Sequence, residues 1–211
     1  MYTPSAFQID DTGRIDELVR TCDFATLLSP AEPFPWVTHA PLLWDRPALR
    51  LTGHLAAANP HAAALQDGAR VLVLFHGPNG YVSPTWYVDE NPAVPNVPTW
   101  NYAAVHMTGR VLRIDAAEEK FALVRTLTRV YEGDGADAWQ PAAAAGNDAR
   151  MRAIVGFHIA VETIEAKFKL SQNRSAADQA AVIAALESRG GDDDRAMARM
   201  MREGSGLATR G

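Results

Sequence analysis

The chain alternates apolar and polar residues over many short stretches, which is the pattern of strands that bury every second side chain. The stretch 70–75 is the most apolar, and we expect it at the centre of a sheet. Proline, glycine and other turn residues separate the stretches. The predicted strands are 24–29, 36–44, 48–55, 70–75, 81–88, 101–114 and 157–164.

Apolar residues at a spacing of about 3.6 predict helices between some of these strands. Asp10 or Asp11 can cap the first helix, and Asn59 followed by Pro60 opens the second. Because Cys22 ends the apolar stripe of the first helix, we expect it to be a buried structural residue. Further helices are predicted at 116–131, at 147–155 with Asn147 as its cap, and at 176–189, with turns or loops at 30–35, 77–80, 91–98 and 133–146.

The order of these elements indicates the fold class. Strands and helices do not alternate strictly, which argues against a doubly wound parallel sheet. Many strands of similar length with inserted helices fit an antiparallel barrel, so the chain is predicted to be mainly β with peripheral helices. We expect one barrel domain over 1–189 and a C-terminal tail over 190–211 that is weakly helical or frayed.

Charge and cysteine content narrow the function classes. The net charge is -5 over 211 residues and no basic run is present, so direct DNA binding is doubtful. One cysteine cannot form a disulfide within the chain, which favours a reducing compartment. No signal-peptide pattern opens the chain, and no apolar run reaches the roughly 18 residues of a membrane span. We therefore expect a soluble cytoplasmic protein that does not enter membranes.

The candidate chemistry lies in four stretches that combine aromatic rings with amide and hydroxyl groups, at 53–60, 81–87, 97–106 and 169–174. A flavin needs this mixture, because its ring faces stack, its ring edge carries carbonyls and nitrogens, and its phosphate needs cationic or amide donors. No phosphate-binding glycine loop, zinc-binding cysteine cluster or serine-hydrolase motif is present. The six histidines have no recognised ligand spacing, so no metal site is predicted.

The four stretches read GHLAAANP, YVSPTWY, VPTWNYAAVH and KLSQNR. Together with the opening MYTP, FATLL at 24–28 and RAIVGF at 152–157, they closely resemble the PaiB family of FMN-binding negative transcriptional regulators. The resemblance runs in order along the chain to about Glu187. It implies a flavin-reductase-like split β-barrel that forms a homodimer and holds FMN in a groove between the subunits.

The resemblance also implies which residues contact the cofactor. The stretch 37–41 would lie along the flavin, and His54 and Asn59 would lie near its phosphate or ribityl chain. Other residues would line the pocket, and the group after the last strand would close it, from the same subunit or from the other one. The predicted FMN-binding residues are Thr38, His39, His54, Asn59, Ser83, Trp86, Thr99, Trp100, Asn101, Tyr102, Lys169, Gln172, Asn173 and Arg174.

One position departs from the family pattern. Relatives usually have an arginine where this chain has Ala57, and in related barrels a basic residue near that loop contacts the FMN phosphate. A charge-assisted contact to phosphate is among the stronger hydrogen bonds. Its loss implies weaker FMN binding, compensation by Arg174 or Lys169, or an empty site.

Two alternatives remain besides a PaiB-like regulator or low-specificity flavin protein. The flavin would serve an FMN-dependent oxidoreductase with a nicotinamide donor, although no dedicated acid–base pair is evident. Related split barrels also host haem, and His54 or His158 would then be the natural axial ligand. A regulator of this charge is expected to act through a partner protein or a small-molecule ligand.

Overall fold

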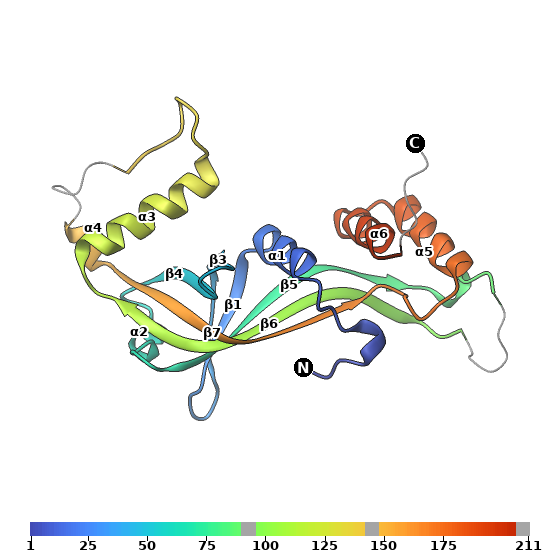
Figure 1. Ribbon diagram of the computed structural model, residues 1–211, viewed down its shortest axis with the longest axis horizontal. Coiled ribbons are helices and arrows are strands. Elements are labelled where there is room, and N and C mark those ends of the chain that lie inside the picture. The colour runs from blue at the N-terminus through green and yellow to red at the C-terminus, as the bar shows by residue number, and fades with distance from the viewer. Residues whose placement is uncertain (90–95, 142–147, 206–211) are drawn as a thin grey trace. The chain divides into compact units, whose positions relative to one another are not determined.

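The computed structural model of the chain describes residues 1–89, 96–141 and 148–205. Seven strands form one antiparallel sheet in the order β2-β1-β5-β6-β7-β4-β3, and within the described residues the sheet is not closed (Figure 1). The strands are β1 (Phe24–Ser29), β2 (Trp36–Pro41), β3 (Leu43–Asp45), β4 (Arg50–Ala56), β5 (Arg70–Val82), β6 (Thr99–Ile114) and β7 (Ile154–Lys169). This arrangement confirms the predicted class, a mainly β split barrel with peripheral helices.

The helices lie before, between and after the strands. They are η1 (Ser5–Phe7), α1 (Thr12–Thr21), α2 (Pro60–Ala64), η2 (Pro84–Trp86), α3 (Ala117–Glu132), α4 (Asp148–Arg152), α5 (Ala176–Arg189) and α6 (Asp192–Ser205), where η marks a 3-10 helix. The two predicted caps hold. The Asp11 carboxylate accepts hydrogen bonds from the first backbone N–H groups of α1, and the Asn59 amide oxygen accepts from the backbone N–H of His61 in α2.

The chain forms two compact units. The first unit comprises Met1–Ile15, His76–Val105 and Glu165–Gly211, and the second unit comprises Asp16–Phe75 and His106–Ile164. Strands β5, β6 and β7 each run from one unit into the other. Each unit buries apolar side chains of its own, with Leu186 and Met201 in the first and Leu27 and Phe157 in the second.

Regular alternation of burial fixes which side chains of the second unit face the core. Strand β4 pairs with β7 from Arg50↔Ala160 to Ala56↔Ile154, and its even and odd positions alternate between half-buried and buried. Strands β1 and β2 pair in the same way from Phe24↔Pro41 to Ser29↔Trp36. Because successive strand residues point to opposite faces, each strand offers one face to the core and one face outward.

Gly109 permits a close approach of backbone inside the second unit. The sequence predicts a bulge or bend there, but β6 runs continuously through the position. A Cβ atom on this residue would lie 2.3 Å from the carbonyl oxygen of Ala160 and 2.9 Å from Cγ2 of Ile159. Glycine is therefore required by packing against β7 rather than by a turn.

Three predicted boundaries are wrong around β5 and β2. No turn interrupts 77–80, because β5 continues to Val82 as part of the sheet and tertiary pairing overrides local turn propensity. The predicted strand 81–88 instead contains η2, whose backbone is capped by the Ser83 hydroxyl and preset by Pro84. The predicted strand 36–44 is divided at Leu42 into β2 and β3.

Two further expectations concern the single residues Cys22 and Asn147. Cys22 is only half-buried, because α1 ends at Thr21 and the cysteine lies beyond the apolar face of the helix. Asn147, the predicted cap of 147–155, lies outside the described residues. The helix that follows ends at Arg152, since Ile154 already belongs to β7.

A further regular helix follows Gly190 within the described residues. Gly190 ends α5 in the left-handed conformation with φ of 73°, and α6 then runs from Asp192 to Ser205 with Met197 and Met201 fully buried. Three aspartates in its first turn and an arginine in its last suit the helix dipole. The division into a domain 1–189 and a tail 190–211 stays a prediction.

Candidate functional site

The two faces of β2 separate the predicted neighbours Thr38 and His39. Thr38 pairs with Leu27 on the face that also carries Ala40, and both of these partners are buried. His39 pairs with Thr26 on the opposite face, and the Thr26 hydroxyl lies 3.1 Å from its Nδ1. A ligand lying on one face of β2 therefore contacts only one of the two side chains directly.

A buried imidazole holds the inner face of β2. The Nδ1 atom of His61 lies 2.8 Å from the Thr38 hydroxyl, and its Nε2 atom lies 2.8 Å from the Ser29 hydroxyl. The Asn59 amide donates a further bond of 3.3 Å to Thr38. The side chain of His61 is buried, and burial lowers its pKa, so the ring is neutral at pH 7. Sequence reasoning missed His61, because nothing in its local pattern distinguishes it from the other helical positions after Pro60.

The outer face of β2 is exposed and carries apolar side chains. Val37 is 51% exposed and Phe24, on the neighbouring strand, is 67% exposed, with the Phe24 ring centroid 6.2 Å from that of His39. Strand β2 is also the first strand of the sheet, so one row of its backbone N–H and C=O groups has no strand partner within the described residues. This face offers a flat apolar surface next to backbone donors and acceptors.

His54 lies on the outward face of β4, in line with Arg50 and Thr52. Its Nδ1 atom is buried and has no hydrogen-bond partner within the described residues, and burial lowers the pKa of the ring. A buried nitrogen without a partner costs roughly 1–3 kcal/mol. Within the described residues His54 makes no hydrogen bond to Thr38 or His61, and a ligand atom that reached its Nδ1 would satisfy that nitrogen.

Lys169 is already engaged within the first unit. Its ammonium donates to the Thr99 hydroxyl and, at 2.9 Å, to the carbonyl oxygen of Trp100. Burial and the nearby Lys167 both lower its pKa. The Trp100 ring is exposed and meets Tyr81 edge-on, with ring centroids 6.4 Å apart. These residues do come together as the sequence predicts.

Asn101 is fully buried and works as a structural residue in the first unit. Its amide donates to the Ser171 hydroxyl at 2.9 Å and approaches Sδ of Met201 at 3.5 Å. Gln172 bonds the backbone of Leu170 and of Phe168, which shapes the turn after β7. The amide groups of both side chains therefore make hydrogen bonds within the chain.

Three of the remaining predicted residues in the first unit, Trp86, Tyr102 and Arg174, take part in contacts between a cation and an aromatic ring. The Arg174 guanidinium lies 4.2 Å from the centre of the Tyr87 ring and donates to Asn96 at 3.0 Å. In this unit Arg189 lies over Trp86, Lys167 lies over Tyr102, Ser83 caps η2, and Asn173 is exposed. Arg174 and Lys169, the two residues expected to compensate for the missing basic contact at Ala57, thus already have partners.

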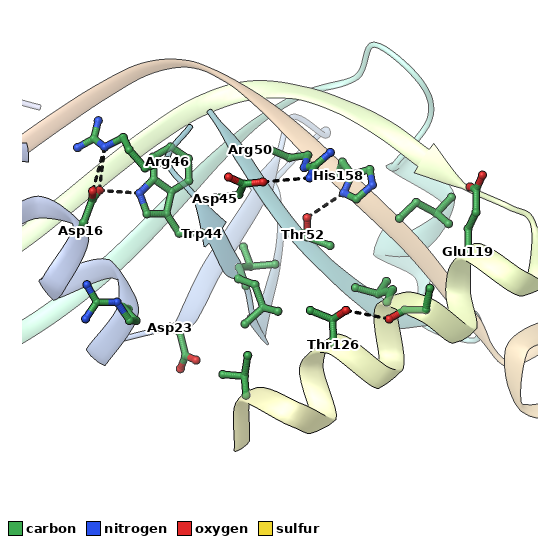
Figure 2. Close-up of a pocket in the computed structure, with 17 residues that line it drawn as sticks. Asp16, Asp23, Trp44, Asp45, Arg46, Arg50, Thr52, Glu119, Thr126 and His158 are labelled. Atoms are coloured by element: carbon green, nitrogen blue, oxygen red, sulfur yellow. Dashed lines mark hydrogen bonds and ion pairs between the residues drawn. The ribbon is translucent and has the colours of Figure 1, made fainter. Parts of the chain in front are cut away.

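A pocket of about 730 Å³ opens in the second unit, and none of the predicted FMN-binding residues lines it (Figure 2). Its walls come from α1, β3, β4, α3 and β7. The sequence gives no sign of it, because its charged residues are scattered along the chain. The lining residues are Asp16, Arg20, Asp23, Leu42, Leu43, Trp44, Asp45, Arg46, Arg50, Thr52, Ile114, Glu119, Ala122, Leu123, Thr126, Val130 and His158.

Comparison with known proteins decides the family. The family model described as "Putative FMN-binding domain" matches residues 1–163. The chain is 34% identical over 210 residues to "Protease synthase and sporulation protein PAI 2" of Bacillus subtilis (strain 168). The alignment covers 96% of this chain and 97% of that protein. The chain belongs to the PaiB family of FMN-binding proteins. Its cofactor is FMN, and neither the oxidoreductase nor the haem alternative is favoured.

Solved structures support the fold of this PaiB-family chain. The FAD and heme binding protein from Mycobacterium smegmatis superposes with a TM-score of 0.62 at 16% identity, covering 87% of this chain and 80% of that one. The flavocytochrome Anf3 from Azotobacter vinelandii gives a TM-score of 0.60 at 14% identity, covering 77% and 69%. At this identity the likeness shows the split-barrel fold alone.

No group of histidine, cysteine or carboxylate side chains among the described residues is arranged to hold a metal ion. No described helix is both long and apolar enough to cross a membrane.

Three histidines make stability depend on pH. Burial lowers the pKa of His54, His61 and His158, with Arg50 adding to the effect on His158. The unfolded chain, with pKa values of about 6.5, therefore binds more protons than the folded chain below that pH. We predict that the free energy of unfolding rises between about pH 5 and pH 6.5 and then levels off. Urea unfolding across this range measures it.

The matched variant is His54→Asn, which removes one of the three contributions. Its free energy of unfolding should depend less steeply on pH than that of the unchanged chain. Equal slopes would show that His54 titrates normally in the folded protein.

Proposed function

We propose that the chain binds FMN on the outer face and free edge of β2, and that a second copy of the chain covers this face. The observation that carries the proposal is the exposed set of Val37, His39 and Phe24 beside an unpaired strand edge. An isoalloxazine ring needs an apolar surface for its face, together with donors and acceptors for its pyrimidine edge. The backbone groups of an edge strand supply those donors and acceptors.

The buried network behind β2 supports this placement. His61 bonds Thr38 and Ser29, so the strand is fixed before any ligand arrives. A preformed surface binds a rigid planar ligand without paying to order a loop. Bound FMN would supply redox chemistry, while the residues of the chain bind and orient it. The other predicted FMN-binding residues, from His54 to Arg174, stay candidates for further contacts.

A homodimer accounts for the exposed apolar side chains. Phe24 and Val37 are exposed on the outer face of β1 and β2, while Trp36, on the opposite face of β2, is partly exposed and stacks on His61. An open apolar edge strand is a liability that proteins cover, and contiguous apolar surface on a monomer commonly marks an interface. We therefore propose that the cytoplasmic form is a dimer with the flavin beside this contact.

We propose a regulatory role of the PaiB type that does not depend on direct DNA contact. Helices α5 and α6 pack together and are joined by Gly190 and Gly191, so they form a helical pair. Three aspartates open α6, and the Asp192 side chain is fully exposed. Negative charge at that position repels phosphate, and the chain as a whole carries -5.

Val37→Glu tests the proposed site. A carboxylate on the exposed face of β2 should weaken FMN binding by about tenfold or more, because it repels the phosphate and must be desolvated beneath the ring. Leu112→Glu is the matched control, since Leu112 is also half-exposed on a strand of the second unit. Quenching of flavin fluorescence during titration measures both dissociation constants. Equal affinity for the Val37→Glu variant and the unchanged chain would rule out this face.

Ala57→Arg tests the departure from the family pattern. Ala57 is exposed and directly precedes the segment capped by Asn59, so an arginine there would reach solvent without disturbing the core. A charge-assisted hydrogen bond contributes about 1.5–3 kcal/mol, so FMN should bind about tenfold tighter or better. Ala58→Arg adds the same charge one residue away and should change the dissociation constant little. If both variants behave alike, the gain is one of net charge and not of a phosphate contact.

A further inference from the structure

The pocket of the second unit is a built cavity that the FMN site does not use. Its volume of about 730 Å³ is in the range of small-molecule sites in proteins. Figure 2 shows Arg50, Thr52 and His158 on one wall, with α3 carrying Glu119 and Thr126 on the other. The cavity lies within one unit, so a single chain supplies all of its walls.

Two carboxylates around this pocket accept hydrogen bonds. The Asp16 carboxylate accepts from the Trp44 indole at 2.7 Å and from Arg46 at 2.9 Å. The Asp23 carboxylate accepts from the Tyr131 hydroxyl at 2.6 Å. The charge of Asp16 is therefore paired with that of Arg46, whereas Asp23 keeps its negative charge in the pocket lining.

Besides Arg20 and Arg46, the pocket is lined by Arg50 of β4, which keeps hydrogen-bond donors to spare. Its Nη2 atom donates to Asp45 at 3.0 Å, while its Nε atom is buried without an acceptor within the described residues. The Arg50 side chain is nevertheless 42% exposed, and it lines the cavity. Buried donors without partners are uncommon in folded proteins and call for an acceptor. A carboxylate is the acceptor that matches the planar guanidinium.

The wall beside Arg50 carries Thr52 and His158, and the charge next to Arg50 is that of its partner Asp45. The Thr52 hydroxyl lies 2.8 Å from Nδ1 of His158, which fixes the imidazole. Burial and Arg50 lower the pKa of His158, although Glu119 acts in the opposite direction. The ring is therefore neutral at pH 7, and Arg50 supplies the positive charge for a ligand on this wall.

The largest remaining part of the lining is apolar, which favours a ligand with an apolar body and one negative charge. Side chains of β3, β6 and α3 form this part, namely Leu43, Ile114, Leu123 and Val130, together with Leu42. Glu119 and Asp23 also line the pocket. Their negative charges disfavour a ligand with a doubly charged phosphate, so FMN itself is a poor fit here.

We propose that this pocket binds a small organic monocarboxylate, with its carboxylate on the Arg50 guanidinium and its apolar body against Leu43, Ile114 and Leu123. Such a ligand would be an effector of the regulator. The site requires no FMN, so its test is independent of the flavin site.

The experiment uses full-length protein saturated with FMN, and 4-fluorobenzoate as the probe. Fluorine NMR of the probe reports binding through line broadening, and 4-fluorobenzamide serves as the uncharged analogue. We expect the benzoate to bind at least ten times more tightly than the amide. Arg50→Gln should abolish this preference, while Arg70→Gln, which alters an exposed arginine outside the pocket, should keep it.

If Arg50→Gln folds poorly, a second pair of variants still tests the proposal. Ala122→Trp places a large ring into the cavity from α3, and Arg129→Trp adds the same ring to an exposed position of α3 that does not line it. We expect the first to lose benzoate binding by at least tenfold and the second to retain it. No binding to the unchanged chain, equal binding of acid and amide, or full binding to Ala122→Trp would each overturn the proposal.

Discussion

The position of β2 depends on one buried imidazole. His61 lies between the hydroxyls of Thr38 and Ser29, and Asn59 both caps the helix that carries His61 and donates to Thr38. These bonds connect β1, β2 and α2 through polar groups that would be costly to bury unpaired. They hold an edge strand whose outer face stays exposed, and that exposed face is where the proposed flavin surface lies.

Polar groups elsewhere in the chain are mostly satisfied internally. Lys169 bonds Thr99 and a backbone carbonyl, and Arg174 packs on Tyr87. Any contact of these cations with FMN must therefore replace or extend an existing bond. Arg50 and His54 differ, because each has a buried nitrogen without a partner within the described residues. The two residues share one face of β4, and this face combines unmet hydrogen-bonding capacity with an adjacent cavity.

The sequence predicts the fold well where local and tertiary signals agree. Strand β1, helix α5 and the Asn59 cap follow from periodicity and capping chemistry. The turn expected at 77–80 fails because strand pairing prevails over Gly and Pro. The candidate site is less predictable. Residues that are neighbours in a sequence motif need not lie on the same face of the fold. Alternation along β2 places Thr38 and His39 on opposite faces, and the side chain of Asn101 is buried in the core. The residues that line the pocket around Arg50 come from segments that are far apart in the sequence, so no local sequence pattern predicts the pocket.

The central claim is that two copies of this chain hold FMN where β2 is exposed. Sedimentation velocity of the protein with FMN, followed at a wavelength where only the flavin absorbs, tests the claim in one measurement. The account predicts one flavin boundary that moves with the mass of a dimer and carries one FMN per chain. Flavin that sediments freely, or with the mass of a single chain, would contradict it.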